Sequence, residues 1–160
     1  MPQSLTPQRF FRVVAVAEAV TWTLLIAAMI VKYGLDGGDL PVRVAGSVHG
    51  FVFLAYAATV VVVALNQRWS LRLTALGVVT AVVPYLTIPF DLGVDRRGLL
   101  DGPWRTSATD DPRDRTRVDR TLRWMLLHPV LFLLVLLVAV AAVMTVLLLL
   151  GPPGEWGSRA

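Results

Sequence analysis

Four long runs of apolar residues divide the chain, with polar stretches between them. The runs cover residues 10–31, 42–65, 71–90 and 124–150. A helix rises ~1.5 Å per residue, so about 20 apolar residues cross the ~30 Å hydrocarbon core of a bilayer. The last run has no polar stripe over residues 131–150, as expected of a helix surrounded by lipid. The pattern predicts an all-α, polytopic membrane bundle with four transmembrane helices, a three-helix core plus a C-terminal fourth.

The connections between the runs predict how the chain is organised. Residues 34–41 are rich in Gly, Asp and Pro and predict a turn, and residues 67–70 form a short link. Pro84 predicts a kink or an early end in the third run, and Pro129 a kink in the last. We expect a three-helix membrane unit over 8–92, a polar loop over 93–111, a C-terminal helix containing the fourth crossing over 112–150, and a tail over 151–160.

The connection between the third and fourth runs is the one strongly charged part of the chain. Residues 91–123 hold eight arginines and seven aspartates, so we expect a solvated segment whose first half is disordered. Asp111 and Pro112 predict a helix start, because aspartate is a favoured N-cap and proline suits the first helical position. Juxtamembrane arginines attract anionic lipid head groups, although the interspersed aspartates weaken this attraction.

The composition agrees with a membrane setting. The chain has 160 residues, of which 56% are hydrophobic and 16% charged, and its mean hydropathy is +0.66. Soluble proteins are roughly 45–50% apolar and 25% charged. The net charge is +4, and the basic residues lie at the ends of apolar runs and in one loop. This distribution argues against a nucleic-acid partner. The absence of cysteine excludes disulfides, thiolate metal sites and cysteine nucleophiles.

Aromatic and basic residues mark the expected membrane interfaces. Lys32, Tyr33, Trp69 and Trp124 lie at run ends, where amphipathic side chains favour the head-group region, whereas Trp22 lies mid-run. Four crossings would put ten Lys and Arg on the side opposite the N-terminus and five on its own side. The positive-inside rule then predicts a cell-membrane protein with the long Arg/Asp loop in the cytoplasm and both termini outside.

The candidate intramembrane polar residues are Glu18, His49, Tyr56 and Asp91. A charge at the bilayer centre costs at least ~2.5–3.5 kcal/mol, so Glu18 and His49 should face the bundle interior, paired or neutral. Counting helical rise from the run ends separates these two by ~12 Å along the membrane normal, which argues against direct contact. At equal depth we expect Tyr56 and Thr59 near Glu18, and Tyr85, Thr87, Asp91 and His128 near His49.

Small residues predict close contacts between helices. Gly46 and Gly50 give the second run a small-xxx-small face, and Ala15 and Ala19 give the first run a comparable one. We expect these faces to pack within the chain rather than in a dimer, although an oligomer stays open. The two histidines lack metal-binding spacing, and P-loop, dinucleotide and G-x-S-x-G motifs are missing. The sequence therefore predicts no metal, no cofactor and no complete catalytic constellation.

The first three runs carry residues typical of a known family. In order these are Arg12 through Glu18, Lys32-Tyr33, Val44 through Gly50 with His49, then Phe53, Tyr56, Trp69-Ser70, Pro84 and Phe90-Asp91. Over residues 8–92 the chain resembles an uncharacterised family of small bacterial integral membrane proteins, domain of unknown function 3817. The resemblance implies a three-helix membrane unit with Glu18, Lys32, His49 and Gly50 among its signature residues, and it implies no activity. Ala19 and Val31 depart from the family's usual Gly and Pro, and the chain from about Trp104 onward lies outside the resemblance.

Two functions fit the sequence. The first is a non-enzymatic membrane or interaction protein, whose partners would be the bilayer and either anionic lipid head groups or another membrane protein. The second is a small proton-coupled transporter or channel that uses Glu18 and His49. Transporters often contain inverted repeats, and none is evident here, so the first hypothesis is favoured.

Overall fold

The computed structural model describes residues 6–150, and its regular elements are all helical, which agrees with the predicted class. They are α1 (Pro7–Gly34), α2 (Leu40–Gln67), α3 (Leu71–Thr80), α4 (Thr87–Arg96), the short 3-10 helix η1 (Pro112–Arg115), α5 (Arg117–Leu127) and α6 (Pro129–Leu150). Within the described part, α1, α2 and α6 are long and apolar enough to cross a membrane. Four transmembrane helices are not confirmed. The expected tail over 151–160 lies outside the described residues.

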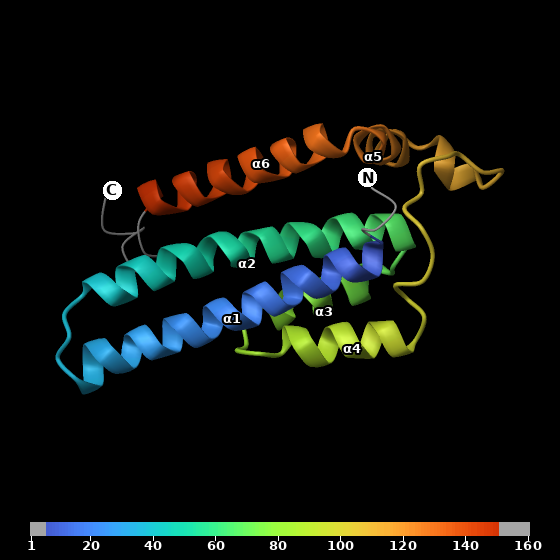
Figure 1. The fold of residues 1–160 in the computed structure, drawn as a ribbon. Coiled ribbons are helices and arrows are strands. Elements are labelled where there is room, and N and C mark those ends of the chain that lie inside the picture. The colour runs from blue at the N-terminus through green and yellow to red at the C-terminus, as the bar shows by residue number, and fades with distance from the viewer. Residues whose placement is uncertain (1–5, 151–160) are drawn as a thin grey trace.

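α1 and α2 are the two long antiparallel helices on which the rest of the fold is built (Figure 1). Each has 28 residues, a length of ~42 Å at the helical rise. Thr6 caps the start of α1, where its hydroxyl accepts the backbone N–H of Arg9 at 3.2 Å. Across the turn between the helices, Lys32 forms an ion pair with Asp39 at 2.9 Å. Arg68, in the left-handed conformation (φ 56°), ends α2.

The third apolar run does not form one continuous helix. Its residues form α3 and α4, ten residues each, so each is ~15 Å long, about half the hydrocarbon core. Residues 81–86 reverse the chain, and Figure 1 shows α4 returning beside α1 toward the end where α3 began. Pro84 has no N–H to continue a helix, and Tyr85 takes a left-handed backbone conformation (φ 66°). The expected kink is thus a full reversal, and α3 with α4 forms a re-entrant hairpin.

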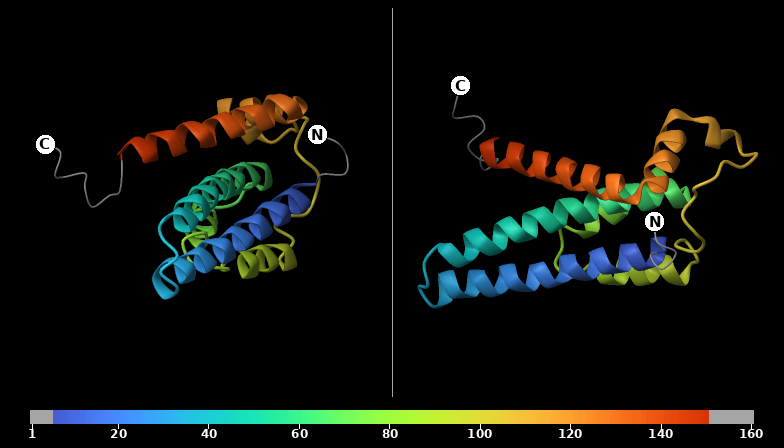
Figure 2. Two further views of the ribbon diagram at one scale, coloured as in Figure 1. Left: turned by 60° about the vertical axis from the view of Figure 1, so that its left-hand side comes forward. Right: turned by 45° about the horizontal axis from the view of Figure 1, so that its top comes forward.

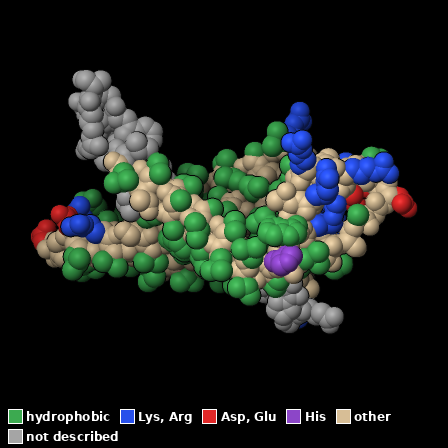
Figure 3. Space-filling model, turned by 90° about the horizontal axis from the view of Figure 1, so that it is seen from above, with side chains coloured by type: hydrophobic (Ala, Val, Ile, Leu, Met, Phe, Trp, Pro, Cys, Tyr) green, Lys and Arg blue, Asp and Glu red, His purple; other side chains and the backbone are tan. Residues whose placement is uncertain are grey.

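Because the hairpin turns back, the start of α1 and the segment after α4 lie at the same end of the bundle. Gln8 donates to Asp95 at 2.6 Å, and the rings of Phe10 and Trp104 meet edge to face at 5.9 Å. A third crossing, as the apolar pattern predicts, would put these segments on opposite sides. We call this end the arginine-rich end; Figure 3 shows most Lys and Arg gathered there. Its arginines are Arg9, Arg12, Arg68, Arg72, Arg96, Arg97, Arg105, Arg113, Arg115, Arg117, Arg120 and Arg123.

The charged connection is folded against the bundle at this end rather than left as the disordered segment that its composition predicts. The carboxylate of Asp114 is buried and receives Arg68 at 2.6 Å and Arg105 at 2.9 Å. Arg105 also donates to the backbone oxygens of Leu65 and Asn66, both at 2.6 Å, which ties the connection to the end of α2. Composition alone predicts that these charged side chains are solvated. In the folded chain they form ion pairs with one another instead.

The last two helices partly agree with the predicted single kinked segment. Asp111 caps η1 as expected, accepting the backbone N–H of Arg113 at 2.9 Å. The chain then breaks at His128, so α5 and α6 are separate helices, with α5 lying across the arginine-rich end (Figures 1 and 2). α6 packs on α2, on the side away from α4 (Figure 2). The fourth apolar run is therefore peripheral to the core of α1, α2 and the hairpin.

Candidate functional site: a polar cluster at the hairpin tip

The tip of the hairpin needs hydrogen-bond partners from outside it. A chain reversal inside the bilayer exposes backbone groups that neither helix satisfies, and such backbone is tolerated where protein surrounds it. The indole N–H of Trp22 donates to the backbone oxygen of Ala81 at 3.2 Å. The hydroxyls of Tyr56 and Thr80 lie 3.0 Å apart, both buried. α1 and α2 thus each bond the tip, which explains why Trp22 lies mid-helix rather than at an interface.

Glu18 reaches the other side of the same tip. Its side chain is fully buried, and Thr87, the first residue of α4, donates its hydroxyl to Oε2 at 2.9 Å. The same hydroxyl lies 3.3 Å from the backbone oxygen of Ala15. A helix N-terminus favours negative charge, so the start of α4 suits a carboxylate here. Oε1 of Glu18 is buried without a hydrogen-bond partner among the described residues.

His49 of α2 lies beside Thr21, one helical turn after Glu18 on α1. Its Nδ1 is 3.1 Å from the hydroxyl of Thr21, which donates to the backbone oxygen of Glu18 at 2.9 Å. The imidazole also packs on the ring of Trp22, with ring centres 4.4 Å apart. No hydrogen bond joins the side chains of Glu18 and His49 in the described part of the chain. The two are linked through Thr21 rather than paired.

The residues expected at the depth of His49 bond other partners. Thr87 bonds Glu18 instead, and Tyr85 lies 3.3 Å from the hydroxyl of Thr23. His128 lies at the junction of α5 and α6, where its ring bonds the backbone oxygen of Trp124 at 2.8 Å. Because the chain reverses at residues 81–86, Thr87 lies beside Glu18 and Asp91 beside Arg12, farther along α1 from His49 than a continuous third helix predicts. Among Glu18's expected neighbours, Tyr56 bonds the tip, and the hydroxyl of Thr59 is buried without a hydrogen-bond partner among the described residues.

Asp91 attaches the open end of the hairpin, which is the end away from its tip, to α1. Its carboxylate is fully buried and forms an ion pair with the Nε of Arg12. Arg12 also reaches Asp95 through Nη2 at 2.8 Å. The end of α4 is therefore fixed to the start of α1 by charge, as its tip is fixed by hydrogen bonds. Arg12 and Thr21 were not predicted from the sequence as partners, and Thr87 was expected near His49 rather than Glu18. The position of Arg12, six residues before Glu18 in α1, is the one signal that could have found it.

The expected packing residues occupy several helix contacts. A side chain at Gly50 would place its Cβ 3.3 Å from Met144 of α6, and one at Gly46 would lie 3.9 Å from Leu25 of α1. Ala15 is fully buried, and Ala19 is partly buried. Gly77, which the sequence reading did not single out, is tighter, since a Cβ there would lie 3.0 Å from Phe90 and Val60. Small residues therefore seat the hairpin as well as the long helices.

The expected interface residues fall into two groups. Tyr33 and Trp124 are 72% and 52% exposed, which suits contact with the membrane interface. Lys32 is partly exposed and lies 4.9 Å from the ring centre of Tyr33. Trp69 instead packs against Phe11 and Phe90, and its N–H donates to the backbone oxygen of Leu99 at 2.8 Å. Trp69 therefore joins the hairpin to the charged connection.

The chemistry available to this cluster is narrow. Residues 6–150 contain no group of three or more His, Cys, Asp or Glu arranged to hold a metal ion. Most of the polar side chains bond the hairpin, and among the described residues Oε1 of Glu18, Oδ1 of Asp91 and the hydroxyl of Thr59 are buried without a hydrogen-bond partner. The arrangement can hold a re-entrant hairpin in lipid and can carry one proton on Glu18.

Comparison with known proteins identifies relatives among membrane proteins. The family model described as Domain of unknown function (DUF3817) matches residues 8–96. A protein of Streptomyces coelicolor named as a membrane protein is 38% identical over 96 residues, which are 59% of this chain and 11% of that relative. YdzA of Bacillus subtilis, called an uncharacterized membrane protein, is 35% identical over 71 residues, 44% of this chain and 73% of YdzA. No solved structure matches the chain.

Proposed function

The chain belongs to the DUF3817 family of membrane proteins, and on that premise we propose that it is a non-enzymatic integral membrane protein that acts through contacts with lipid and with other membrane proteins. One observation carries this proposal. Three buried or partly buried polar side chains are bonded to the hairpin, Trp22 to Ala81, Tyr56 to Thr80 and Glu18 to Thr87, while buried His49 lies against Thr21 of α1. Their bonds hold the fold together, which leaves the outer surfaces for function.

The relatives support a modular role. The matched unit makes up 11% of the Streptomyces relative and most of YdzA, so similar sequence occurs both inside a long chain and nearly alone. A unit used in both settings needs an activity that survives a change of neighbours. Anchoring and contact in the membrane meet this requirement.

We also propose that the arginine-rich end faces the cytoplasm. Twelve arginines lie there, against Lys32 and Arg43 at the opposite end of the described residues. The positive-inside rule counts Lys and Arg in short segments near the membrane and favours the cytoplasm for the richer side. The charged connection keeps its expected side, while the start of α1 joins it in the cytoplasm instead of lying outside.

Proton transfer through Glu18 is the second candidate. It is favoured by the unbonded Oε1 of Glu18 and by the broken third segment, because discontinuous helices commonly form transporter sites near the bilayer midplane. His49 would supply a second proton-carrying group one helical turn away, beside Thr21, whose hydroxyl bonds the backbone oxygen of Glu18 and not its carboxylate.

A reconstituted proton-flux assay decides between the two. Purified full-length chain is placed in vesicles carrying a pH-sensitive dye, beside empty vesicles and the variants Glu18→Gln and His49→Ala. Thr145→Val serves as a matched control, because Thr145 is exposed on α6 and its hydroxyl bonds the backbone oxygen of Ala141. The contact role predicts equal flux in all samples. Wild-type flux above that of empty vesicles, lost in Glu18→Gln and kept in Thr145→Val, would overturn it.

A further inference from the structure

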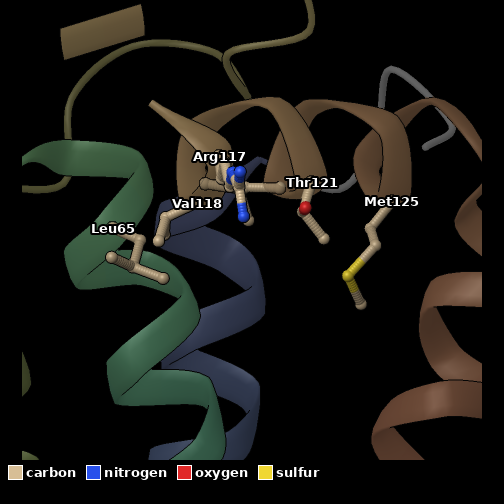
Figure 4. Close-up of a pocket in the computed structure, with 6 residues that line it drawn as sticks. Leu65, Arg117, Val118, Thr121 and Met125 are labelled. Carbon is tan, nitrogen blue, oxygen red and sulfur yellow. The ribbon is translucent and has the colours of Figure 1, made fainter. Parts of the chain in front are cut away.

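A groove lies where α5 crosses the end of α2. It has a volume of about 320 Å³, and Figure 4 shows Val118, Thr121 and Met125 of α5 above Leu65 of α2. Its walls are mainly aliphatic, with Arg117 at the edge. The lining residues are Leu65, Arg117, Val118, Thr121, Leu122 and Met125.

The groove lies at the charged end of the long apolar helix α2, where hydrocarbon is expected to meet head groups. Leu65 is in the last turn of α2, at the arginine-rich end, and 40% of it is exposed. α5 is amphipathic, with Leu122 and Leu126 buried against the bundle and Arg117 and Arg120 exposed. Such a helix lies in the plane of the interface with its apolar face toward the acyl chains. An apolar groove at this level opens toward lipid.

Arg117 lines the groove and, like Arg115 and Arg120, has no carboxylate partner among the described residues. Arg68 and Arg105 are held by Asp114, and Arg123 donates to the backbone oxygen of Asp114 at 2.6 Å. Among residues 6–150 no ion pair or hydrogen bond is found for the side chain of Arg117. Its guanidinium, on the edge of an apolar groove, is therefore complementary to a group that joins negative charge to a hydrocarbon chain.

We propose that this groove binds one anionic phospholipid, with an acyl chain between Leu65 and α5 and the phosphate on Arg117. Planar guanidinium binds phosphate oxygens through two donors at once. A free phosphate would leave the groove empty, and a zwitterionic lipid would gain less from the arginine. The site requires only that the chain is in a membrane, although it gives the contact role proposed above a specific ligand.

Native mass spectrometry of the full-length chain in detergent tests this site. The probes are phosphatidylglycerol and phosphatidylcholine with identical acyl chains, and inorganic phosphate as a competitor. We expect wild-type protein to bind one phosphatidylglycerol more tightly than phosphatidylcholine. Arg117→Ala should weaken phosphatidylglycerol binding about fivefold, the equivalent of ~1 kcal/mol for one arginine near the membrane surface.

Arg72→Ala is the matched control, since Arg72 is exposed at the same end, has no ion pair among the described residues and lies outside the groove. It should bind like wild type. Equal effects of the two variants, or equal binding of the two lipids, would overturn the site. Displacement of the lipid by inorganic phosphate would show that the site binds anions in general. That result would overturn the proposal that the groove holds an acyl chain. The proton-flux assay does not affect these binding outcomes. The lipid site and the contact role are therefore tested independently, and one can be overturned without the other.

Discussion

At the scale of single residues, the buried polar groups are explained by the backbone that they bond. A hydrogen bond between helices in a membrane contributes about 0.6 kcal/mol on average and at most about 1.7, because the alternative states also find partners. Thr87 makes two such contacts with α1, to the carboxylate of Glu18 and to the backbone oxygen of Ala15. Trp22 and Tyr56 serve the same tip from α1 and α2.

Thr87→Val should lower the free energy of unfolding by about 0.6–1.7 kcal/mol, since valine keeps the shape and removes the hydroxyl. Thr145→Val should have little effect, because that hydroxyl is exposed and bonds only its own helix. Steric trapping or denaturant titration in detergent micelles would measure both. Equal stability of the two variants would mean that the Glu18–Thr87 contact does not hold the hairpin.

At the scale of elements, the hairpin depends on close packing as well as on hydrogen bonds. α3 packs between α2 and α4, and Gly77 leaves room for the ring of Phe90 and for Val60. The hairpin's open end is fixed by Arg12 with Asp91 and by Trp69 against Phe90. Each helix of the hairpin has only ten residues, so the hairpin depends on all of these contacts to stay in place within lipid.

Gly77→Ala should destabilise the protein by about 1–3 kcal/mol, because an added methyl group overpacks a filled contact. Gly93→Ala, in the other arm of the hairpin, has no atom within 4 Å of the added Cβ and should be neutral or stabilising by up to ~1 kcal/mol. Thermal unfolding in detergent compares the pair. A hairpin that tolerates Gly77→Ala as well as Gly93→Ala would contradict the packing described.

The charged connection should loosen in acid. Hydrogen bonds from Thr109, then from Arg68, lower the pKa of Asp114 from its usual 3.8 to about 2, and Arg113 lowers the pKa of Asp111. A carboxylate with a lowered pKa stabilises the folded state above its ordinary pKa and loses that contribution as pH falls through the lowered value. The connection should therefore hold near neutral pH and loosen between about pH 4 and pH 2.

A spin label at Ser107→Cys would report this transition, since the parent chain has no cysteine. Its mobility should rise on acidification, while a label at Thr145→Cys on α6 should stay unchanged. In an Asp114→Asn background the Ser107 label should be mobile at every pH. A transition that survives Asp114→Asn would show that another group controls the connection.

At the scale of the whole molecule, the hairpin decides which segments lie at the same end of the bundle. A third crossing would separate the start of α1 from the charged connection, whereas a hairpin brings them together. The contacts of Gln8 with Asp95 and of Phe10 with Trp104 follow from that arrangement. The proposed cytoplasmic position of the arginine-rich end follows from the same geometry and the positive-inside rule.

Cysteine accessibility in intact cells tests the arrangement. Single cysteines at Gln8, Ser107 and Asp36 report the start of α1, the connection and the opposite end, and all three residues are exposed. Only Asp36→Cys should react with a membrane-impermeant maleimide added outside. Opposite labelling of Gln8→Cys and Ser107→Cys would restore the four-crossing scheme, and labelling of both without Asp36→Cys would reverse the orientation.

The pattern of the sequence was sufficient for the helical class, the membrane setting, the two long helices α1 and α2 to within three residues at each end, an irregularity near Pro129 and the burial of Glu18 and His49. These follow from local properties: runs long enough to cross lipid, residues that cap or break helices, and the cost of charge in hydrocarbon. The family motifs lie in the same runs. Pro84 marked the place where the chain changes direction within the third run.

The direction of the chain after Pro84 was decided by tertiary structure alone. A kinked crossing and a reversal have the same apolar pattern, and they differ in whether Trp22, Tyr56 and Glu18 can bond the tip. Those bonds join residues far apart in the chain, which periodicity does not detect. The folding of the charged connection has the same cause, because buried Asp114 is stabilised by Arg68 and Arg105 from other segments. Long-range pairing of polar groups therefore set the topology that hydropathy left open.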